Sequence, residues 1–513
     1  MNAQAHIAKL PRVSSIDIAV AAFVLWLMVD DLLLQGREFE LFAYLRLVAL
    51  LLCYVGVRLL RCRAVIVLGA VAVWTLVEVA VALLQLGSII ESNHLLFGMT
   101  GTFGNPGPLG GFVAMGIVVM AGLMATMRSK AATATVAALT CLAAVVLVCA
   151  DSRAGWLATA VGIAYLFGRY IARAWRRRIP MWGKCVALVV SAGVLVAAYF
   201  YKEKSANGRL LIWRTTIDMI ADSPLTGHGS GSHAEQYMYY QAKYFEAKPE
   251  SPLADRAGVV DRSFNDLLRV WSEGGLVALL IVVFIVCHID WRAKGWQLTV
   301  NAAMLSMATF ALFSYPSYLL PFQLAFAALL GCAASGEHGG GKCKTEVAAL
   351  ALAACAGTLV YCQCRVSDAD AQLQELIAGR EVHIDTDTEE AICATPRLLS
   401  TYATYAATHG DVEILELAAR KSPSPDLLCD LAVYNAAAGD HANAESWLHT
   451  AHYMVPGKIR PQYELYRLYV AEGDTTRARM VVKNVTGNSI DAKSSAALRM
   501  IGEMKRFYEN TTE

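Results

Sequence analysis

The sequence predicts an all-α polytopic membrane protein of about eleven transmembrane helices, followed by a C-terminal helical-repeat tail. Hydrophobic residues make up 56% of the 513 residues, charged residues only 17%, and the mean hydropathy is +0.43. Soluble domains usually carry about 25% charged residues. Eleven apolar stretches are each long enough to cross a bilayer, and a repeat of 34 residues marks the polar end of the chain.

Composition also excludes two other classes of protein. The 44 Lys and Arg residues nearly balance the 43 Asp and Glu residues, which leaves a net charge of +1. A nucleic-acid binder normally shows a basic face or stripe, so the sequence predicts no nucleic-acid partner. The 13 cysteines are sparse and lie mostly inside apolar runs, which excludes a secreted disulfide scaffold.

The predicted spans and the charges between them give an orientation. The spans lie near 16–35, 41–59, 64–86, 109–126, 132–150, 155–171, 183–200, 267–289, 297–314, 318–335 and 346–362. Arg and Lys residues follow the even-numbered spans, from Arg58 after the second to Lys342 and Lys344 after the tenth. Cytoplasmic loops carry this excess, so the N-terminus is predicted in the cytoplasm and the C-terminus outside.

The tail at 369–513 is predicted to form a small α-solenoid. Ala438-Gly439-Asp440 recurs as Glu472-Gly473-Asp474, an offset of 34 residues that is typical of tetratricopeptide repeats. A Gly410-Asp411 turn suggests a third, degenerate hairpin. Such a tail either docks a protein or peptide or serves as a helical cap. Cys393 and Cys429 lie about one repeat apart, so a disulfide and two unpaired thiols are both open.

Two motifs near the outer membrane boundary are candidates for anion binding. The run from Phe97 to Gly111, FGMTGTFGNPGPLGG, has a Gly and Pro density that is incompatible with a regular helix and favours tight turns. The N–H groups of such turns can face a phosphate. Arg153, in the sequence SRAG between the fifth and sixth spans, suits a lipid-linked anion. The alternatives are a simple turn and a snorkelling arginine.

The large outward loop, residues 201–266, holds further candidates. Arg209 and Arg214 are expected to share a helix face, and guanidinium groups match diphosphate oxygens well. His228 and His233 are candidate bases, although lone loop histidines more often have no catalytic role. The aromatic run 237–245 suits either sugar faces or the membrane interface. No HExxH motif, CxxC pair or clustered ligand spacing occurs, so no catalytic metal site is predicted.

Polar residues recur at helical spacing where the eighth span begins. Asn265, Asp266, Arg269 and Glu273 would line one face of a helix near the outer boundary. Polar groups in such a place are costly unless they are paired or face a wet cavity. The alternative to a functional role is an intrahelical Arg269–Glu273 ion pair.

Taken in order, these motifs resemble the O-antigen ligase/polymerase superfamily, which includes bacterial O-linked oligosaccharyltransferases. The resemblance rests on the Gly/Asn/Pro loop, SRAG, GRLLIW followed by DSPLTGHG, and FND…EGGL. It covers 95–290 by motif and 1–362 by topology. Phe264-Asn265 stands where many ligases have His-Asn, and the Phe-Asn-acidic variant with a tetratricopeptide tail is similar to Bacteroidetes relatives.

The resemblance implies a GT-C-like helical glycosyltransferase domain at 1–365, including the periplasmic loop 201–266, with the repeat domain at 369–513. Its active site faces the periplasm, in a Gram-negative inner membrane. The implied reaction transfers a glycan from an undecaprenyl-diphosphate carrier to an acceptor hydroxyl, without metal or other cofactor. Arg153, Arg209 and Arg214 fall on the basic positions that hold the diphosphate. Candidate glycan contacts are Asn105, Trp213, Tyr240, Asn265 and Arg269.

The resemblance does not identify the general base or the acceptor. Phe264 replaces the histidine that is the family's usual base candidate, so the role passes to nearby groups, first to Asp266 or Glu273 and then to His228. The acceptor is predicted to be Ser or Thr of a periplasmic protein, which a docking tail would help to recruit. The alternatives are ligation of O-antigen to the lipid A core, O-antigen polymerisation and, from a different class, transport of a lipid-linked oligosaccharide.

Overall fold

All regular structure in the described part of the chain is helical. The computed structural model describes residues 13–60, 64–94, 96–177, 180–181, 203–335, 345–487 and 494–512. The first elements are α1 (Ser15–Val29), the π-helix η1 (Asp30–Leu34), α2 (Leu41–Leu60), α3 (Ala64–Leu86), α4 (Pro106–Met124), α5 (Lys130–Cys149) and α6 (Arg153–Arg177). They are followed by α8 (Glu203–Asp222), α9 (Ser232–Ala247), η2 (Ala254–Arg256), α10 (Asp266–Cys287), α11 (Gly295–Ala311), η3 (Pro316–Tyr318) and α12 (Leu320–Ser335).

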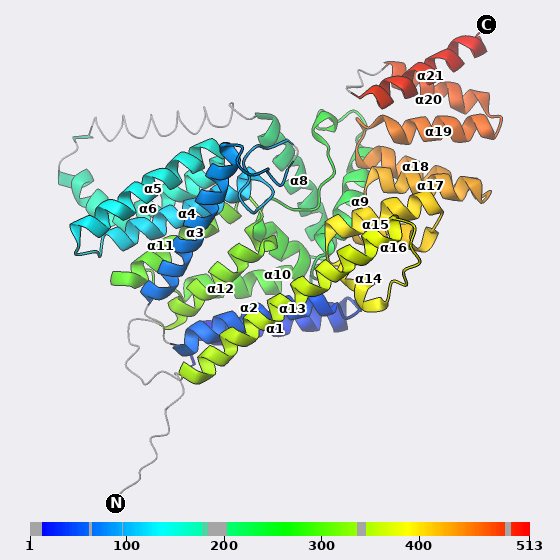
Figure 1. Cartoon of the computed structure of the whole chain (residues 1–513). Helices are drawn as coiled ribbons and strands as arrows, with labels where there is room; N and C mark the ends of the chain where they lie inside the picture. Colours follow the sequence, from blue (N-terminus) through cyan, green and yellow to red (C-terminus); the bar gives the residue numbers. More distant parts are fainter. Residues whose placement is uncertain are drawn as a thin grey trace, which may run out of the picture.

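The remaining helices lead into and form the tail. They are α13 (Thr345–Ile377), α14 (Thr386–Cys393), α15 (Pro396–His409), α16 (Val412–Lys421), α17 (Pro425–Ala437), α18 (His441–Met454), α19 (Ile459–Ala471), α20 (Thr475–Gly487) and α21 (Ser495–Thr512). In Figure 1 the apolar helices form one bundle, and α14 to α21 extend from one side of it as a stack that ends at the C-terminus.

Helices of membrane-spanning type confirm the polytopic membrane class. Every predicted span forms a helix except the one near 183–200, which lies outside the described residues. Within the described residues, six helices are long and apolar enough to cross a bilayer, namely α2, α3, α4, α5, α10 and α13. Three other predicted spans are shorter, because α1, α11 and α12 have 15, 17 and 16 residues. Helix α6 is long but ends in arginines.

Helix α4 lies at the centre of the bundle and is almost entirely buried. Its glycines permit close approach: a Cβ at Gly111 would lie 2.3 Å from the Phe310 ring, and one at Gly116 would lie 2.2 Å from Thr75. The expectation that Gly and Pro exclude a helix from 97–111 was wrong for its second half. Proline is tolerated in a first helical turn because it needs no N–H partner there, and α4 begins at Pro106.

Helix α10 is broken at Gly275, which has φ 67°. The loop before α9 fills the break: the amides of His228 and Gly229 donate to the carbonyls of Ser272 and Glu273, at 3.0 and 2.9 Å. In return, the amide of Leu276 donates to the carbonyl of Pro224 at 3.0 Å. The DSPLTGHG and EGGL motifs are therefore two sides of one backbone contact, which fixes the start of α10 against the outward loop.

The tail is built from helical hairpins with a common turn. Gly410, Gly439 and Gly473 each end a helix with a left-handed φ of 73°, 84° and 76°. The following aspartate in each case accepts a hydrogen bond from a backbone amide of the next helix, as an N-cap does. These are the turns that the sequence predicted. Cys393 and Cys429, whose pairing was open, are free thiols.

The tail is attached to the membrane bundle by one helix and by a set of charged contacts. Helix α13 runs for 33 residues and packs along α2, so it joins the bundle to the stack without a linker. At the other side, Lys421 of α16 pairs with Glu40 and, at 3.4 Å, with Glu235 of α9. Arg37 makes a bidentate contact of 2.8 Å with the same Glu235 carboxylate. The stack is thus held against α9 and the α1–α2 connection.

Candidate active site

A cavity of about 250 Å³ lies where the start of α4 meets the start of α6, α8 and the end of α11. Asn105 lines it from the first of these segments, Arg153 from the second and Arg209 from the third. These residues come from three motifs that are far apart in the sequence. The structure therefore brings together three of the predicted site residues around one space.

Short contacts between α4 and α6 place Arg153 at the cavity. The Ser152 hydroxyl donates to the carbonyl of Gly107 at 3.1 Å. A Cβ at Gly155 would lie 2.8 Å from the carbonyl oxygen of Gly110, so only glycine permits this approach. The SRAG motif is thus a packing motif that lets α6 begin beside α4. The first residues of α4 and α6 consequently both line the cavity.

Arg209 provides a half-buried positive charge in this cavity. Its burial and the nearby Arg153 charge lower the pKa of the guanidinium below its ordinary value. The Cζ atom of the Arg209 guanidinium lies 5.6 Å from the centre of the Phe264 ring. Among the described residues, no carboxylate forms an ion pair with Arg209. Two guanidinium groups held together in this way favour a doubly charged anion, which would relieve their repulsion.

Two polar residues of the apolar helix α3 hold the 99–102 turn beside the cavity. The Glu78 carboxylate accepts hydrogen bonds from the Thr102 amide at 2.9 Å and its hydroxyl at 2.7 Å. The Gln85 side-chain oxygen accepts from the amides of Thr100 and Gly101 at 2.9 and 2.8 Å. This support was not predicted from the sequence, although a Glu and a Gln seven residues apart on one face of an apolar helix are its signal.

An acidic and basic cluster surrounds the start of α10. Both carboxylate oxygens of Asp266 accept from Ser317, at 3.0 Å from the amide and 2.5 Å from the hydroxyl. One turn on, the Nε of Arg269 lies 3.4 Å from a carboxylate oxygen of Glu273, which is 5% exposed. The intrahelical pair that the sequence analysis gave as an alternative therefore exists. The other Glu273 oxygen is buried and has no hydrogen-bond partner within the part of the chain that the structure describes.

A ladder of arginines and aromatic rings connects this cluster with the cavity. The Phe264 ring that faces Arg209 packs edge-on against Tyr315, with centroids 5.0 Å apart. The guanidinium of Arg262 lies 4.5 Å from the Tyr315 ring centre and 5.8 Å from that of Tyr318. Phe264 has φ 52°, a left-handed conformation that costs a non-glycine residue energy and often marks functional sites.

Four other residues that were predicted for the site do not line the cavity. Arg214 is exposed, lies outside the cavity and pairs with Asp218 at 3.6 Å, so it does not share the cavity-facing side of α8 with Arg209. Asn265 caps α10 by accepting from the amides of Leu267 and Leu268. Trp213 packs near Phe313, with ring centroids 6.2 Å apart. The Tyr240 hydroxyl donates to Asp222 at 2.8 Å.

The two candidate histidines also lie apart from the cavity lining. The Nε2 of His228 lies 2.8 Å from the Met219 carbonyl and must be the donor, because a carbonyl only accepts. Only its Nδ1 is then left to take a proton. His233 is fully buried, with Nε2 3.2 Å from the Thr216 hydroxyl. Among the described residues, no three His, Cys, Asp or Glu side chains lie together as metal ligands would.

His233 is expected to make the fold sensitive to acid. Burial lowers the pKa of its imidazole from 6.5 to about 3, so the folded protein binds fewer protons than the unfolded chain between these values. The stability that the neutral His233 imidazole contributes to the fold is complete above pH 6.5 and is lost as the pH falls toward 3. His233→Gln, which retains a partner for Thr216, should flatten the dependence of the melting temperature on pH in this window. An unchanged dependence would contradict the assignment.

Comparison with known proteins identifies the domain that contains this site. Residues 136–283 match the family model described as O-antigen ligase. The match includes Arg153, Arg209, Phe264, Asp266 and Glu273, whereas Asn105 and the η3 segment lie outside it. No curated protein matches the chain. The match covers both arginines of the cavity, whereas the parts of α4 and α11 that also line it lie outside. The domain at 136–283 belongs to the O-antigen ligase superfamily.

Proposed function

We propose that the protein transfers a glycan from an undecaprenyl-diphosphate carrier to Ser or Thr hydroxyls of periplasmic proteins. The family match indicates O-antigen ligase-type glycosyl transfer. The observation that carries the proposal is the half-buried Arg209 beside Arg153 in one cavity at the start of α4 and α6. Such a site suits a diphosphate linked to a lipid, because guanidinium groups form paired, permanently charged hydrogen bonds with phosphate oxygens.

The chemistry follows from these charges. The acceptor oxygen attacks the anomeric carbon of the first sugar, and the bond from that carbon to the diphosphate oxygen breaks with its electron pair. Arg153 and Arg209 stabilise the negative charge that develops on the departing lipid diphosphate. The acceptor proton passes to a carboxylate. Asp266 suits this role better than Glu273, because it lies two residues after Phe264, whose ring faces Arg209, whereas Glu273 is already paired with Arg269.

Removing the carboxylate base is expected to slow transfer strongly. Asp266→Asn should lower the rate by about 10²–10⁴-fold, the usual contribution of a positioned base, while the amide keeps an acceptor for Ser317. Glu273→Gln should have a smaller effect on the rate. The measurement is transfer of a lipid-linked oligosaccharide by each purified variant in nanodiscs. Equal rates for Asp266→Asn and the wild type would assign the base elsewhere.

The acceptor distinguishes this proposal from its closest alternatives. A tail fixed against α9 beside the outward loop supports a protein acceptor, since a lipid or glycan acceptor needs no such element. In a deletion strain, periplasmic glycoproteins should disappear while lipopolysaccharide ladders persist. Loss of the ladders with intact glycoproteins would instead favour O-antigen ligation or polymerisation. A transporter would leave the purified protein without any transfer activity.

The proposed setting is a bacterial inner membrane with the cavity and the tail in the periplasm. The excess of Lys and Arg after even-numbered spans supports a cytoplasmic N-terminus. A reporter that is active only in the periplasm, fused after residue 513, should be active. An inactive fusion would reverse the orientation.

A further inference from the structure

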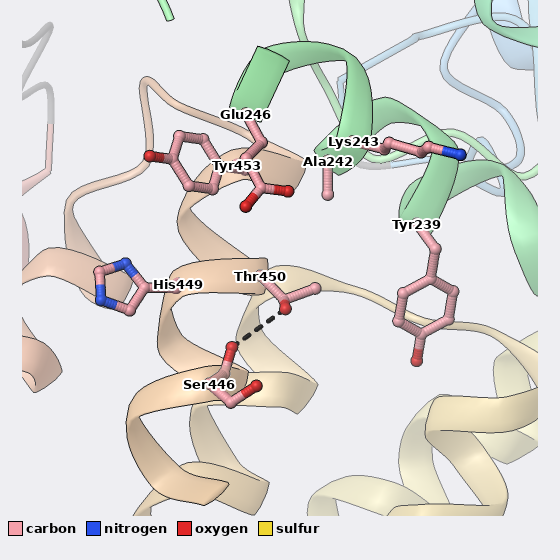
Figure 2. A pocket seen from close by; sticks show the side chains of 8 residues that line it. All are labelled: Tyr239, Ala242, Lys243, Glu246, Ser446, His449, Thr450 and Tyr453. Carbon is pink, nitrogen blue, oxygen red and sulfur yellow. Dashed lines mark hydrogen bonds between the residues drawn. The ribbon is translucent and has the colours of Figure 1, made fainter. Parts of the chain in front are cut away.

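A second cavity lies between the outward helix α9 and the tail helix α18. It holds about 410 Å³ and is shown in Figure 2. One wall is made by Tyr239, Ala242, Lys243 and Glu246 of α9. The other is made by Ser446, His449, Thr450 and Tyr453 of α18. We call this space, lined by these eight residues, the α9–α18 groove.

The groove is a fixed feature because α9 is clamped to the tail beneath it. The amide nitrogen of Gln241, a fully buried residue, donates to the carbonyls of Met454 at 2.5 Å and Gly258 at 3.1 Å. The Tyr239 hydroxyl donates to the carbonyl of Ala419 in α16 at 3.2 Å. Buried apolar side chains such as Met238 also pack in this contact. The two walls therefore keep their spacing without an occupant.

The two walls have the same sequence pattern and an unusual composition. On each helix the lining residues follow the spacing i, i+3, i+4 and i+7, which defines one face. Two packed helices normally fill such facing positions with apolar side chains. Here seven of the eight lining residues are polar or aromatic. This face is thus suited to a ligand that offers both hydrogen bonds and apolar surface.

The groove lining carries one cationic and one anionic side chain, Lys243 and Glu246. Lys243 lies near the Tyr240 ring, with its ammonium 6.0 Å from the ring centre. Glu246 is exposed, points between the walls in Figure 2, and has no ion pair among the described residues. The tail as a whole is acidic, since residues 369–513 hold 21 Asp and Glu against 14 Lys and Arg. A partner with basic side chains is therefore electrostatically favoured.

We propose that the α9–α18 groove binds an extended segment of the acceptor polypeptide that carries a Lys or Arg side chain. The lining spans seven helical residues, about 10 Å, which matches about three residues of extended chain. Glu246 pairs with the basic side chain, and the hydroxyls of Ser446 and Tyr453 form hydrogen bonds with the peptide backbone. This assignment rests on the proposed transfer to proteins, for which it supplies a recruitment site away from the Arg153–Arg209 cavity.

The test measures binding of defined peptides to the full-length protein in nanodiscs by fluorescence anisotropy. The probe is a fluorescein-labelled nonapeptide with three Ser-Lys-Ala units, compared with the same peptide carrying Glu in place of Lys. The lysine peptide should bind several-fold more tightly. Glu246→Lys should reverse this preference, and Ser446→Trp should block both peptides. Glu381→Lys, the same charge change on an exposed loop of the tail, should leave binding unchanged.

Two outcomes would overturn the groove assignment: equal binding of the two peptides, or equal effects of Glu246→Lys and Glu381→Lys. Displacement of the lysine peptide by an uncharged linear glucan hexasaccharide would assign the groove to a glycan and also overturn it. Arg209→Ala separates the two proposals, because it should abolish glycan transfer and leave peptide binding intact. Full transfer by Arg209→Ala would defeat the proposed function while leaving the groove assignment standing.

Discussion

Replacing Arg209 by alanine is expected to lower the rate of glycan transfer at least about 100-fold, the loss typical for one group that stabilises charge in a transition state. Arg209 is half-buried and lines the cavity, beside Arg153 and over the Phe264 ring. The rate should be measured with a lipid-linked oligosaccharide donor and purified protein in nanodiscs.

The matched control for this variant is Arg214→Ala, which removes the same charge from the same helix. Arg214 is 59% exposed at its side chain and pairs with Asp218. An exposed pair of this kind contributes at most about 1 kcal/mol to stability. Transfer by Arg214→Ala should stay within about threefold of the wild type. Similar losses in both variants would show that the net charge of α8 matters and that the cavity does not.

The second large effect is expected from Gly275→Ala, at the break in α10. Its Cβ would lie 2.1 Å from the carbonyl oxygen of Leu225, and the φ of 67° disfavours any side chain. Backbone strain and overpacking together should lower the free energy of unfolding by about 2–5 kcal/mol. Because the same contact fixes the start of α10, transfer activity should fall as well. Thermal unfolding and transfer rate are the two measurements.

Gly231→Ala provides the control for Gly275→Ala. Gly231 also has a left-handed φ, 79°, but an added Cβ would meet no atom within 4 Å. Gly231→Ala should lower the free energy of unfolding only by the cost of the left-handed conformation, about 1–2 kcal/mol. If the two variants unfold at the same temperature, the contact between the DSPLTGHG and EGGL motifs has no stabilising role beyond the glycine conformation.

Much of the membrane part was predictable because its signals are local. Apolar length defines the spans, and the Gly-Asp turns of the tail appear in the sequence as they do in the structure. Arg153 and Arg209 were predicted through motifs whose order is typical of the superfamily. The expectation that Arg214 shares a helix face with Arg209 was wrong, because both arginines carry the same charge but the spacing between them puts them on different sides of the helix. Five residues correspond to 500° of helix rotation, so the two side chains lie about 140° apart.

The remaining features depend on contacts between distant segments. Asp266 is held by Ser317, which is 51 residues later, and the ladder joins Phe264 to Tyr315. Neither contact has a periodic or compositional signal. The α9–α18 groove joins walls some 200 residues apart, and its pattern is visible on each helix only once the two are known to face each other. The start of α4 was misplaced because proline and glycine were weighed without their positions in the first turn.

The most direct test of the central claim is the affinity of the protein in nanodiscs for undecaprenyl diphosphate, compared between the wild type, Arg209→Ala and Arg214→Ala. If the cavity holds the diphosphate, the wild type and Arg214→Ala should have equal affinities, and the affinity of Arg209→Ala should be at least about tenfold lower. Undecaprenol, which lacks the diphosphate, should bind all three proteins alike. An unchanged affinity of Arg209→Ala for undecaprenyl diphosphate would contradict the assignment of this cavity to the lipid diphosphate.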